Sequence, residues 1–526
     1  MNSYATYKAY SHEVYFWLLA FIAISMPYME LFSIIGLILL FINWILEGNF
    51  SHKLSIFKHK KSISVFSAIF FIHVIWLLGT SQWDEAFRNI FIKLPLLILP
   101  VIIGTSEPIK IPKVRKLLQL FIGSVSLAVV AHFIISKKWL PVDSDKILKS
   151  GIFVSKSQLT CMVVVSTLTL FHWIKSMGRN FKASLVVYIV LAILMLVYLA
   201  SIHSLAGLIV LAITFLILVI SYINRLENQM LKIGLIMLIY AIPFFSIVLM
   251  IKTYHQFFHS KQPEYNVSQL FTKAGNPYYN QSASWEIENG NKVWVNVCEK
   301  ELSKEWNKIS EIKYEDLDLK GQPLRLTLIR YMTSKGLKKD AEGIALLSGR
   351  DIINVQKGMT NYIFDTHWSL LTRIYEVFWE VHQFKHSKCS SQEHSLSVRL
   401  EKYHIALSVA AKHLFFGVGT GDLDLIYSDL NKGHKICLKA EDKNDTGNQF
   451  LYVLCSFGII GLILFIFALV LPGILEMKWD SYYFLMIFCV IVLSFFVFEV
   501  LESFAGTIFC TFFYSFYLWG TYRNLE

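Results

Sequence analysis

The uncharged stretch QFLYVLCSFGIIGLILFIFALVLPG (residues 449–473) decides the fold class of this chain. It exceeds the roughly 20 apolar residues that one helix needs to cross a bilayer. The pattern extends through the whole chain of 526 residues, of which 55% are hydrophobic and only 17% charged. Because soluble domains carry about 25% charged residues, this composition excludes a cytosolic globular enzyme, a disordered chain and a secreted disulfide scaffold. A polytopic integral membrane protein remains.

Apolar runs predict twelve membrane spans, and the charges between them predict their orientation. Lys and Arg gather in the loops after even-numbered spans, for example at residues 53–61 and 110–116, which favours a cytoplasmic position for those loops. Both termini are then cytoplasmic, and the long segment 252–448 lies outside. The predicted spans are 13–26, 28–46, 62–79, 88–104, 116–136, 152–174, 184–200, 202–222, 231–251, 449–473, 481–497 and 500–519.

The formal net charge of +11 comes from basic residues beside apolar segments. Such residues determine topology, so we expect membrane lipids and no nucleic acid among the partners. The seven cysteines show no metal-ligand spacing, and we expect neither a metal site nor a disulfide framework.

The chain divides into three predicted parts. Residues 1–251 form an N-terminal bundle of about nine spans, residues 252–448 a large external domain, and residues 449–526 the C-terminal transmembrane helices. The external segment is too long for an unstructured loop and shows helical spacing of apolar residues. Within it, 396–416 is amphipathic and is expected to lie along the membrane surface. The predicted fold class is an all-α polytopic membrane protein, with a mainly helical periplasmic domain before the last three spans.

Arg399 stands near the start of this amphipathic segment, at the predicted boundary between the external domain and the membrane. A guanidinium forms paired hydrogen bonds to phosphate and keeps its charge. A lipid-linked diphosphate would present its phosphates at this depth, which makes Arg399 a candidate ligand. Position alone favours the alternative, an interfacial arginine whose charge extends into water.

The run GVGTGD (417–422) follows directly. Its glycines, Gly417, Gly419 and Gly421, permit tight turns and close backbone approach before Asp422. No Lys-Ser/Thr follows, so the run is not a nucleotide-binding phosphate loop. The alternative to ligand binding is a turn that ends the preceding helix, and glycine spacing alone favours it.

Polar residues also interrupt the late apolar runs. Asn448 and Gln449 stand where the chain re-enters the membrane, and their spacing favours capping of a helix over lining a site. Glu499 and Glu502 would share one face of a helix, and carboxylates at membrane depth are functional candidates. The alternative for Glu499 is a position at the interface.

Lys93 and Arg88 stand at the start of another apolar run, IKLPLLILP (92–100). Two interpretations of these cations compete. They either extend to opposite membrane interfaces or bind an anionic lipid headgroup.

Several stretches, taken in order, resemble the O-antigen ligase family, in the long-loop form common in Bacteroidota-type sequences. GQPLRLTLIRYMTSKGLKKDAEGIALLSGRDI (321–352) resembles a block of that form's external domain. FFGVGTGD and then DTGNQFLYVLCSFGIIGL (445–462) resemble the segments that lead back into the membrane, and FEVLESFAGTIFCTFFYSF (498–516) is similar to the closing helices. The similarity covers most of the chain and is specific from about residue 285 to residue 516.

This resemblance implies a glycosyltransferase of the bacterial inner membrane. Such enzymes move a glycan from undecaprenyl diphosphate to an acceptor hydroxyl, often on lipid A-core or another surface glycan. They act on the periplasmic side without nucleotide sugar, cofactor or metal. The resemblance further implies that Arg399 grips the diphosphate. The other residues in matching motifs are Gly417, Gly419, Gly421, Asp422, Asn448 and Gln449.

Two side chains expected from the family are absent. Gly447 stands where a histidine normally precedes the asparagine, and Leu205 occupies the place of a second arginine in LASIHSLAGLIV (199–210). Glycine cannot move a proton. Either another residue supplies the base, or the acceptor is acidic enough to need none, or transfer is lost while lipid-glycan binding remains. Candidate replacement bases are His404, His434 and Asp445.

Three functional interpretations remain open. The first is an O-antigen ligase-like transferase, the second an O-antigen polymerase-like transferase with another acceptor. The third is a non-catalytic protein that binds lipid-linked glycan in the surface-polysaccharide pathway. A transporter is disfavoured because the sequence shows no inverted repeat with paired broken helices.

Overall fold

A computed structural model of the chain describes residues 2–136, 152–177, 183–202, 204–259, 270–281, 283–284, 286–365, 370–387, 395–427 and 446–522. These residues are mostly helical, and one pair of short strands occurs among them. The chain forms two compact units. The first comprises Met1–Lys232 and Arg399–Glu526, and the second comprises Ile233–Val398.

The first unit contains the apolar helices that come before the second unit in the sequence and those that come after it. α12 (Gln229–Phe258) and α18 (Ser395–Lys412) each have residues in both units. The others are α1 (Asn2–Ser25), α2 (Glu30–Glu47), α3 (Phe50–His59), α4 (Lys61–Ile75), η1 (Trp76–Gly79), α5 (Trp83–Lys93), α6 (Pro95–Thr105), α7 (Ile111–Ser136), α9 (Lys156–Ser176), α10 (Ala183–Ser201), α11 (Leu205–Asn224), α20 (Gln449–Leu475), α21 (Tyr482–Phe495), η4 (Val500–Glu502) and α22 (Phe504–Leu518).

Within the described residues, nine helical segments are long and apolar enough to cross a membrane, and α21 and α22 are shorter apolar helices. Each of the twelve predicted runs coincides with described helix, the first of them with α1. The prediction of an all-α protein with many apolar helices is therefore confirmed. The number of crossings stays a prediction.

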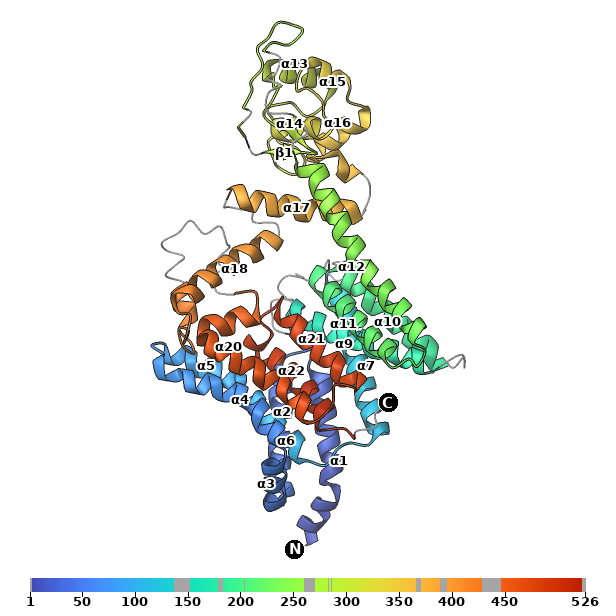
Figure 1. The fold of residues 1–526 in the computed structure, drawn as a ribbon, viewed down its shortest axis with the longest axis vertical. Coiled ribbons are helices and arrows are strands. Elements are labelled where there is room, and N and C mark those ends of the chain that lie inside the picture. Colours follow the sequence, from blue (N-terminus) through green and yellow to red (C-terminus); the bar gives the residue numbers. More distant parts are fainter. Residues whose placement is uncertain are drawn as a thin grey trace. The chain divides into compact units, whose positions relative to one another are not determined.

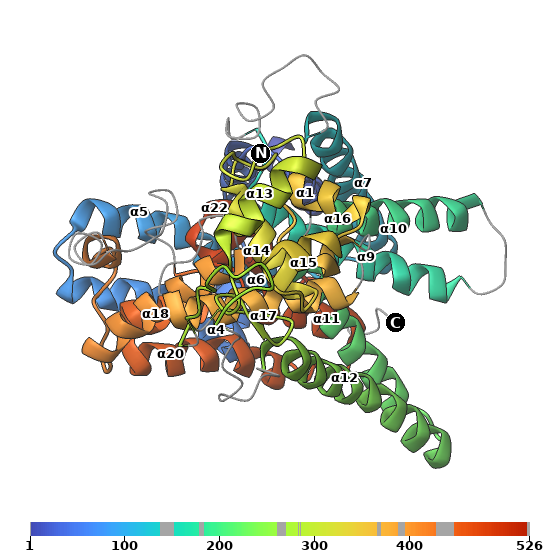
Figure 2. The ribbon, with the colours of Figure 1, turned by 90° about the horizontal axis from the view of Figure 1, so that it is seen from above.

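α22 forms the centre of the first unit. Every residue from Phe504 to Leu518 is buried, and the helix packs against α5, α6, α9 and α21. In Figures 1 and 2 this C-terminal helix lies among helices that are distant in sequence. A helix that is apolar on every side is stable only when it is surrounded in this way.

α20 is interrupted where it carries Gly458, whose φ of 66° and ψ of −170° are not helical. The segment 414–419 forms hydrogen bonds with backbone groups that have no helical partner at the interruption. The N–H groups of Val418 and Gly419 donate to the carbonyl oxygens of Cys455 and Ser456, at 2.9 and 2.8 Å. The N–H of Ile459 donates to the carbonyl of Leu414 at 2.8 Å. Because a membrane interior offers no water to such groups, this pairing allows a broken helix there.

Replacing Gly458 with alanine is expected to lower the thermal unfolding midpoint of the purified protein by several degrees. A Cβ at this position would lie 2.2 Å from the carbonyl oxygen of Phe415, in a left-handed conformation that L residues rarely adopt. We expect a loss of roughly 1–3 kcal/mol. Gly123→Ala in α7 is the matched control, because nothing lies within 4 Å of its Cβ. Equal midpoints for the two variants would contradict the role of Gly458.

The second unit has its own apolar core. Its helices include α13 (Glu299–Ile309), α14 (Leu324–Ser334), α15 (Ala341–Ala345), α16 (Gly349–Gln356), η2 (Tyr362–Asp365) and α17 (Leu370–Ser387), and β1 (Ile287–Glu288) pairs antiparallel with β2 (Asn291–Lys292). Trp306 of α13, Leu328 and Met332 of α14 and Val355 of α16 are fully buried in one cluster. Figures 1 and 2 show α13 to α16 gathered into this small body.

Candidate functional site

A charged network is buried within the apolar first unit. The side chain of Lys93, at the end of α5, is 0% exposed, and its Nζ lies 2.8 Å from Oε2 of Glu502. Lys93 also donates to the carbonyl oxygen of Leu501. Gln449 completes the network: its Nε2 donates to Oε1 of Glu502 and its Oε1 accepts from Leu501 N, both at 2.8 Å. Buried charges need such partners, because an isolated one costs several kcal/mol.

The interpretation of Lys93 as an interfacial or headgroup-binding cation is wrong. Its charge is met by Glu502 inside the protein, and no part of its side chain is exposed. The two residues are 409 positions apart in sequence, so local patterns gave no sign of the pair. Arg88 is exposed and pairs with Glu85 at 3.2 Å.

Glu499 and Glu502 do not share the face of one helix, which corrects the spacing argument. Glu499 precedes the short 3-10 helix η4 with φ −87° and ψ 74°, and Glu502 ends that turn. The two carboxylates consequently meet different partners. Glu502 joins Lys93 and Gln449, whereas Glu499 accepts from the N–H of Thr446 at 2.5 Å and from its hydroxyl.

Asn448 caps α20, as its spacing indicated. Its Oδ1 accepts from the N–H groups of Phe450 and Leu451 at 2.8 and 3.1 Å. Its Nδ2 donates to the carbonyl oxygen of Phe496 at 3.1 Å, which fixes the start of α20 against the segment before Glu499. Gln449 instead belongs to the buried network, so the neighbouring residues have different structural roles.

Gly447 adopts a left-handed conformation, with φ of 69°. A Cβ at this position would lie 3.6 Å from the side chains of Lys402 and Tyr403, which is ordinary van der Waals contact. The backbone conformation favours glycine, but the surrounding side chains leave room for a Cβ at this position. The residue that replaces the expected histidine therefore lies directly beside α18.

α18 brings two cations to this region. The guanidinium carbon of Arg399 lies 5.8 Å from the ring centroid of Phe498, and its residue is half-buried. Lys402 is buried, with 6% exposure, and lies one helical turn further along. The hydroxyl of Tyr403 donates to Phe496 O at 3.0 Å and holds α18 against the same segment.

Arg399, Lys402, Gly447 and Glu499 thus gather between the start of α20 and the turn before α22, and we name them the α18–α20 site. Two basic side chains and one carboxylate suit a phosphate-bearing substrate and a proton transfer. Lys402 was missed from the sequence. Its i,i+3 spacing from Arg399 was the available indication that both share a helix face.

The other predicted catalytic residues are less informative. His404 lies on α18 with an exposed side chain. Asp445 and His434 lie outside the described residues. Leu205 is the first residue of α11, and Ser204 caps that helix. Among the described residues, no three His, Cys, Asp or Glu side chains are grouped to hold a metal ion.

The GVGTGD run packs closely against other backbone segments. Gly417, Gly419 and Gly421 all have left-handed φ values, of 67°, 102° and 100°. A Cβ on Gly417 would lie 2.3 Å from the backbone of Ser456, and one on Gly421 would lie 2.7 Å from the N of Ala86. These glycines therefore allow approaches that other residues would block. Their predicted contact with substrate stays a prediction.

Asp422 binds the turn that leads into α5. Its carboxylate accepts from the backbone N–H groups of Ser81 and Gln82, at 2.9 and 2.8 Å, and from the hydroxyl of Thr80. A carboxylate is favourable at a helix N-terminus because it meets unpaired N–H groups and the positive end of the helix dipole. The geometry gives Asp422 a structural role in holding α5, the helix that carries Lys93.

The apolar helices and the buried charged network define a multi-pass membrane protein. Residues 358–466 match the O-antigen ligase family model. This match confirms the resemblance to the O-antigen ligase family that the sequence motifs indicate. The matched segment contains Arg399, Lys402 and Gly447, and it ends before Glu499. A comparison with curated proteins finds no match.

Proposed function

We propose that this protein is an O-antigen ligase-like glycosyltransferase. It would transfer a glycan from undecaprenyl diphosphate to a hydroxyl of lipid A-core or of another surface glycan. The proposal rests on one observation within the segment that matches the family. Arg399 lies 5.8 Å from the ring of Phe498, the residue before Glu499, and Lys402 lies beside Gly447, whose neighbour Thr446 donates to Glu499. We place the protein in the bacterial inner membrane, with cytoplasmic termini and a periplasmic segment 252–448, on the loop charges.

In this proposal Arg399 and Lys402 bind the diphosphate. Fixed cations stabilise the negative charge that develops on a departing diphosphate, and they act without reorganising during the reaction. The half-buried Arg399 remains accessible for paired hydrogen bonds to phosphate oxygens. Lys402 is nearly enclosed, where the electrostatic attraction to phosphate is stronger than in water. The lipid tail holds the donor at the depth of the site, so that the donor and the enzyme need only be oriented correctly relative to each other.

Glu499 is the proposed general base in place of the missing histidine. Its carboxylate contacts Thr446, the residue directly before Gly447. The acceptor oxygen attacks the anomeric carbon while the bond from that carbon to the diphosphate oxygen breaks. The proton of the acceptor hydroxyl passes to Glu499, and undecaprenyl diphosphate leaves. Such direct displacement inverts the anomeric configuration. His404 and Asp445 stay alternative candidates for the base.

Replacing Glu499 with glutamine is expected to lower transfer by roughly 100-fold or more, because an amide cannot accept the proton. Glu499→Asp should retain part of the activity. Transfer by the wild type should rise with pH through the range in which its base loses a proton, and Glu499→Gln should lose this rise. The measurement is glycan transfer in reconstituted membranes, with undecaprenyl diphosphate-linked glycan as donor and lipid A-core as acceptor.

Glu107→Gln, which changes an exposed carboxylate between α6 and α7, is the control for this experiment and should transfer normally. Wild-type rates in Glu499→Gln would contradict the role of Glu499 as base. An unchanged pH dependence in a slower variant would assign it a structural role.

A polymerase-like transferase would use the same donor chemistry with a growing glycan as acceptor. A non-catalytic protein that binds lipid-linked glycan is the second candidate, and the left-handed Gly447 favours it, because this backbone is suited to the residue that cannot move a proton. Retained donor binding by the wild type, without transfer to either acceptor, would support that candidate.

A further inference from the structure

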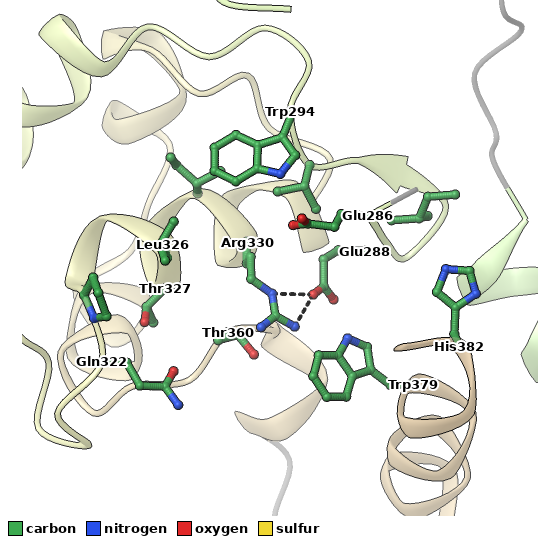
Figure 3. A pocket seen from close by; sticks show the side chains of 14 residues that line it. Glu286, Glu288, Trp294, Gln322, Leu326, Thr327, Arg330, Thr360, Trp379 and His382 are labelled. Carbon is green, nitrogen blue, oxygen red and sulfur yellow. Dashed lines mark hydrogen bonds and ion pairs between the residues drawn. The ribbon is translucent and has the colours of Figure 1, made fainter. Parts of the chain in front are cut away.

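The second unit contains a cavity of about 370 Å³ outside the α18–α20 site. It lies within the roughly 300–1,000 Å³ that ligand pockets occupy. Its walls come from β1, the segment after β2, α14 and α17, and they combine two tryptophans with polar side chains. Figure 3 shows Trp294 and Trp379 on either side of the pair formed by Arg330 and Glu288.

The charge on Arg330 is satisfied within the protein. Its Nε lies 2.8 Å from Oε1 of Glu288, and the other oxygen of Glu288 accepts from Tyr375 at 2.5 Å and from Asn361 at 2.8 Å. Burial acts to lower the pKa of Arg330, but the attraction and hydrogen bonds of the Glu288 carboxylate outweigh it, so the pKa of Arg330 is raised and its guanidinium stays charged. The pair therefore forms a polar part of the cavity wall, and the guanidinium of Arg330 is not available to bind an anion.

The tryptophans provide flat apolar surfaces. The guanidinium of Arg330 lies 5.0 Å from the ring centroid of Trp379 and orients that indole. Trp294 is half-buried, packed partly against the core of the unit, and its ring lines the cavity. The C–H face of a sugar ring is apolar and stacks on such rings, while its hydroxyls point outward to polar groups. Glu286, Gln322 and Thr360 supply such groups in the lining of the cavity.

The charges of the lining select among sugars. Two carboxylates, Glu286 and Glu288, face one arginine, and His382 is the other titratable group of the lining. The excess of negative charge repels a uronic acid or a phosphorylated sugar and accepts a neutral one. Carboxylate and amide oxygens also accept hydrogen bonds from sugar hydroxyls.

We propose that this cavity is a binding site for a neutral oligosaccharide, with one sugar ring stacked on Trp294 and its hydroxyls bound by Glu286 and Gln322. The site is separate from the residues proposed to carry out transfer, and it goes beyond that proposal. It gives the second unit a role in selecting glycans by their sugar units rather than by their lipid carrier.

The test is calorimetric titration of the full-length protein in nanodiscs with maltotetraose, cellotetraose and chitotetraose, and with a hyaluronan tetrasaccharide as the acidic probe. We expect binding of at least one neutral probe and weaker binding of the acidic one. Trp294→Ala should weaken the binding at least about tenfold, since stacking and burial of the ring are lost. Tyr279→Ala is the matched control, because this exposed aromatic residue of the same unit lies outside the cavity.

Gln322→Ala guards against a folding artefact, because Gln322 is exposed and its loss leaves the core of the unit intact. We expect roughly threefold to tenfold weaker binding, the effect of one lost hydrogen bond. The proposal is overturned if no neutral probe binds, if the acidic probe binds best, or if both variants bind like the control. Oligosaccharide binding without transfer would overturn the proposed function alone. Transfer without oligosaccharide binding would overturn this inference alone.

Discussion

Replacing Arg399 with alanine is expected to lower glycan transfer by roughly 100-fold to 1,000-fold, the usual effect of removing one fixed group that stabilises developing negative charge. The cause is the loss of paired hydrogen bonds to the diphosphate. Arg399 is half-buried and lies 5.8 Å from the ring of Phe498, a contact of only about 0.5–1 kcal/mol, so the fold should tolerate its loss. The measurement is transfer in reconstituted membranes, beside the thermal unfolding midpoint of the same preparation.

Two variants sharpen the Arg399 experiment. Arg399→Lys keeps the charge but not the planar pair of donors, and should give an intermediate rate. Arg115→Ala removes an exposed arginine of α7 and should transfer normally. Full activity of Arg399→Ala would refute diphosphate binding by this residue. A lowered midpoint that matches the lost activity would show that Arg399 acts on stability instead.

Replacing Lys93 with methionine is expected to destabilise the first unit by roughly 3–5 kcal/mol, because Glu502 is left as a buried carboxylate without its cation. The pair joins α5 to the turn before α22, and Gln449 joins it to α20. Loss of Lys93 therefore loosens three elements that are distant in sequence. We expect a large decrease in the unfolding midpoint of the purified protein, measured by near-ultraviolet circular dichroism.

The double variant Lys93→Met, Glu502→Gln should recover most of that loss, since no unpaired charge then remains and the amide can still meet Gln449. Lys113→Met is the matched control. Its ion pair with Glu13 is partly exposed, and such pairs contribute little to stability. A double variant no more stable than Lys93→Met would show that the Lys93–Glu502 pair stabilises the unit by something other than charge balance.

The helices were predictable because hydropathy is a local property. The uncharged run 449–473 and the other apolar runs coincide with described helices, since about 20 apolar residues in sequence suffice to indicate one. The capping role of Asn448 was predictable on the same ground: its partners, Phe450 and Leu451, lie within three residues.

The site was only partly predictable. Arg399 was predicted as a diphosphate ligand from the family resemblance and from its position in the sequence. Its neighbour Lys402 was missed, although both residues lie on one turn of α18. The prediction that Glu499 and Glu502 share a helix face was wrong, because Glu499 lies before the 3-10 helix in a non-helical conformation. The two carboxylates therefore meet different partners. The run GVGTGD gave glycines suited to close approach, and the structure shows which backbones approach them.

The sequence by itself determined the class of protein: an apolar, helical, multi-pass chain with motifs that resemble the O-antigen ligase family. Only the tertiary structure decided which charges meet. Lys93 pairs with Glu502, which is 409 positions away in sequence. The segment 414–419 forms hydrogen bonds with the backbone where α20 is interrupted at Gly458. In the second unit, Trp294, Arg330 and Trp379 line one cavity. The physical reason is range. Hydropathy and caps act over a few residues, whereas the pairing of buried charges depends on which distant helices pack together.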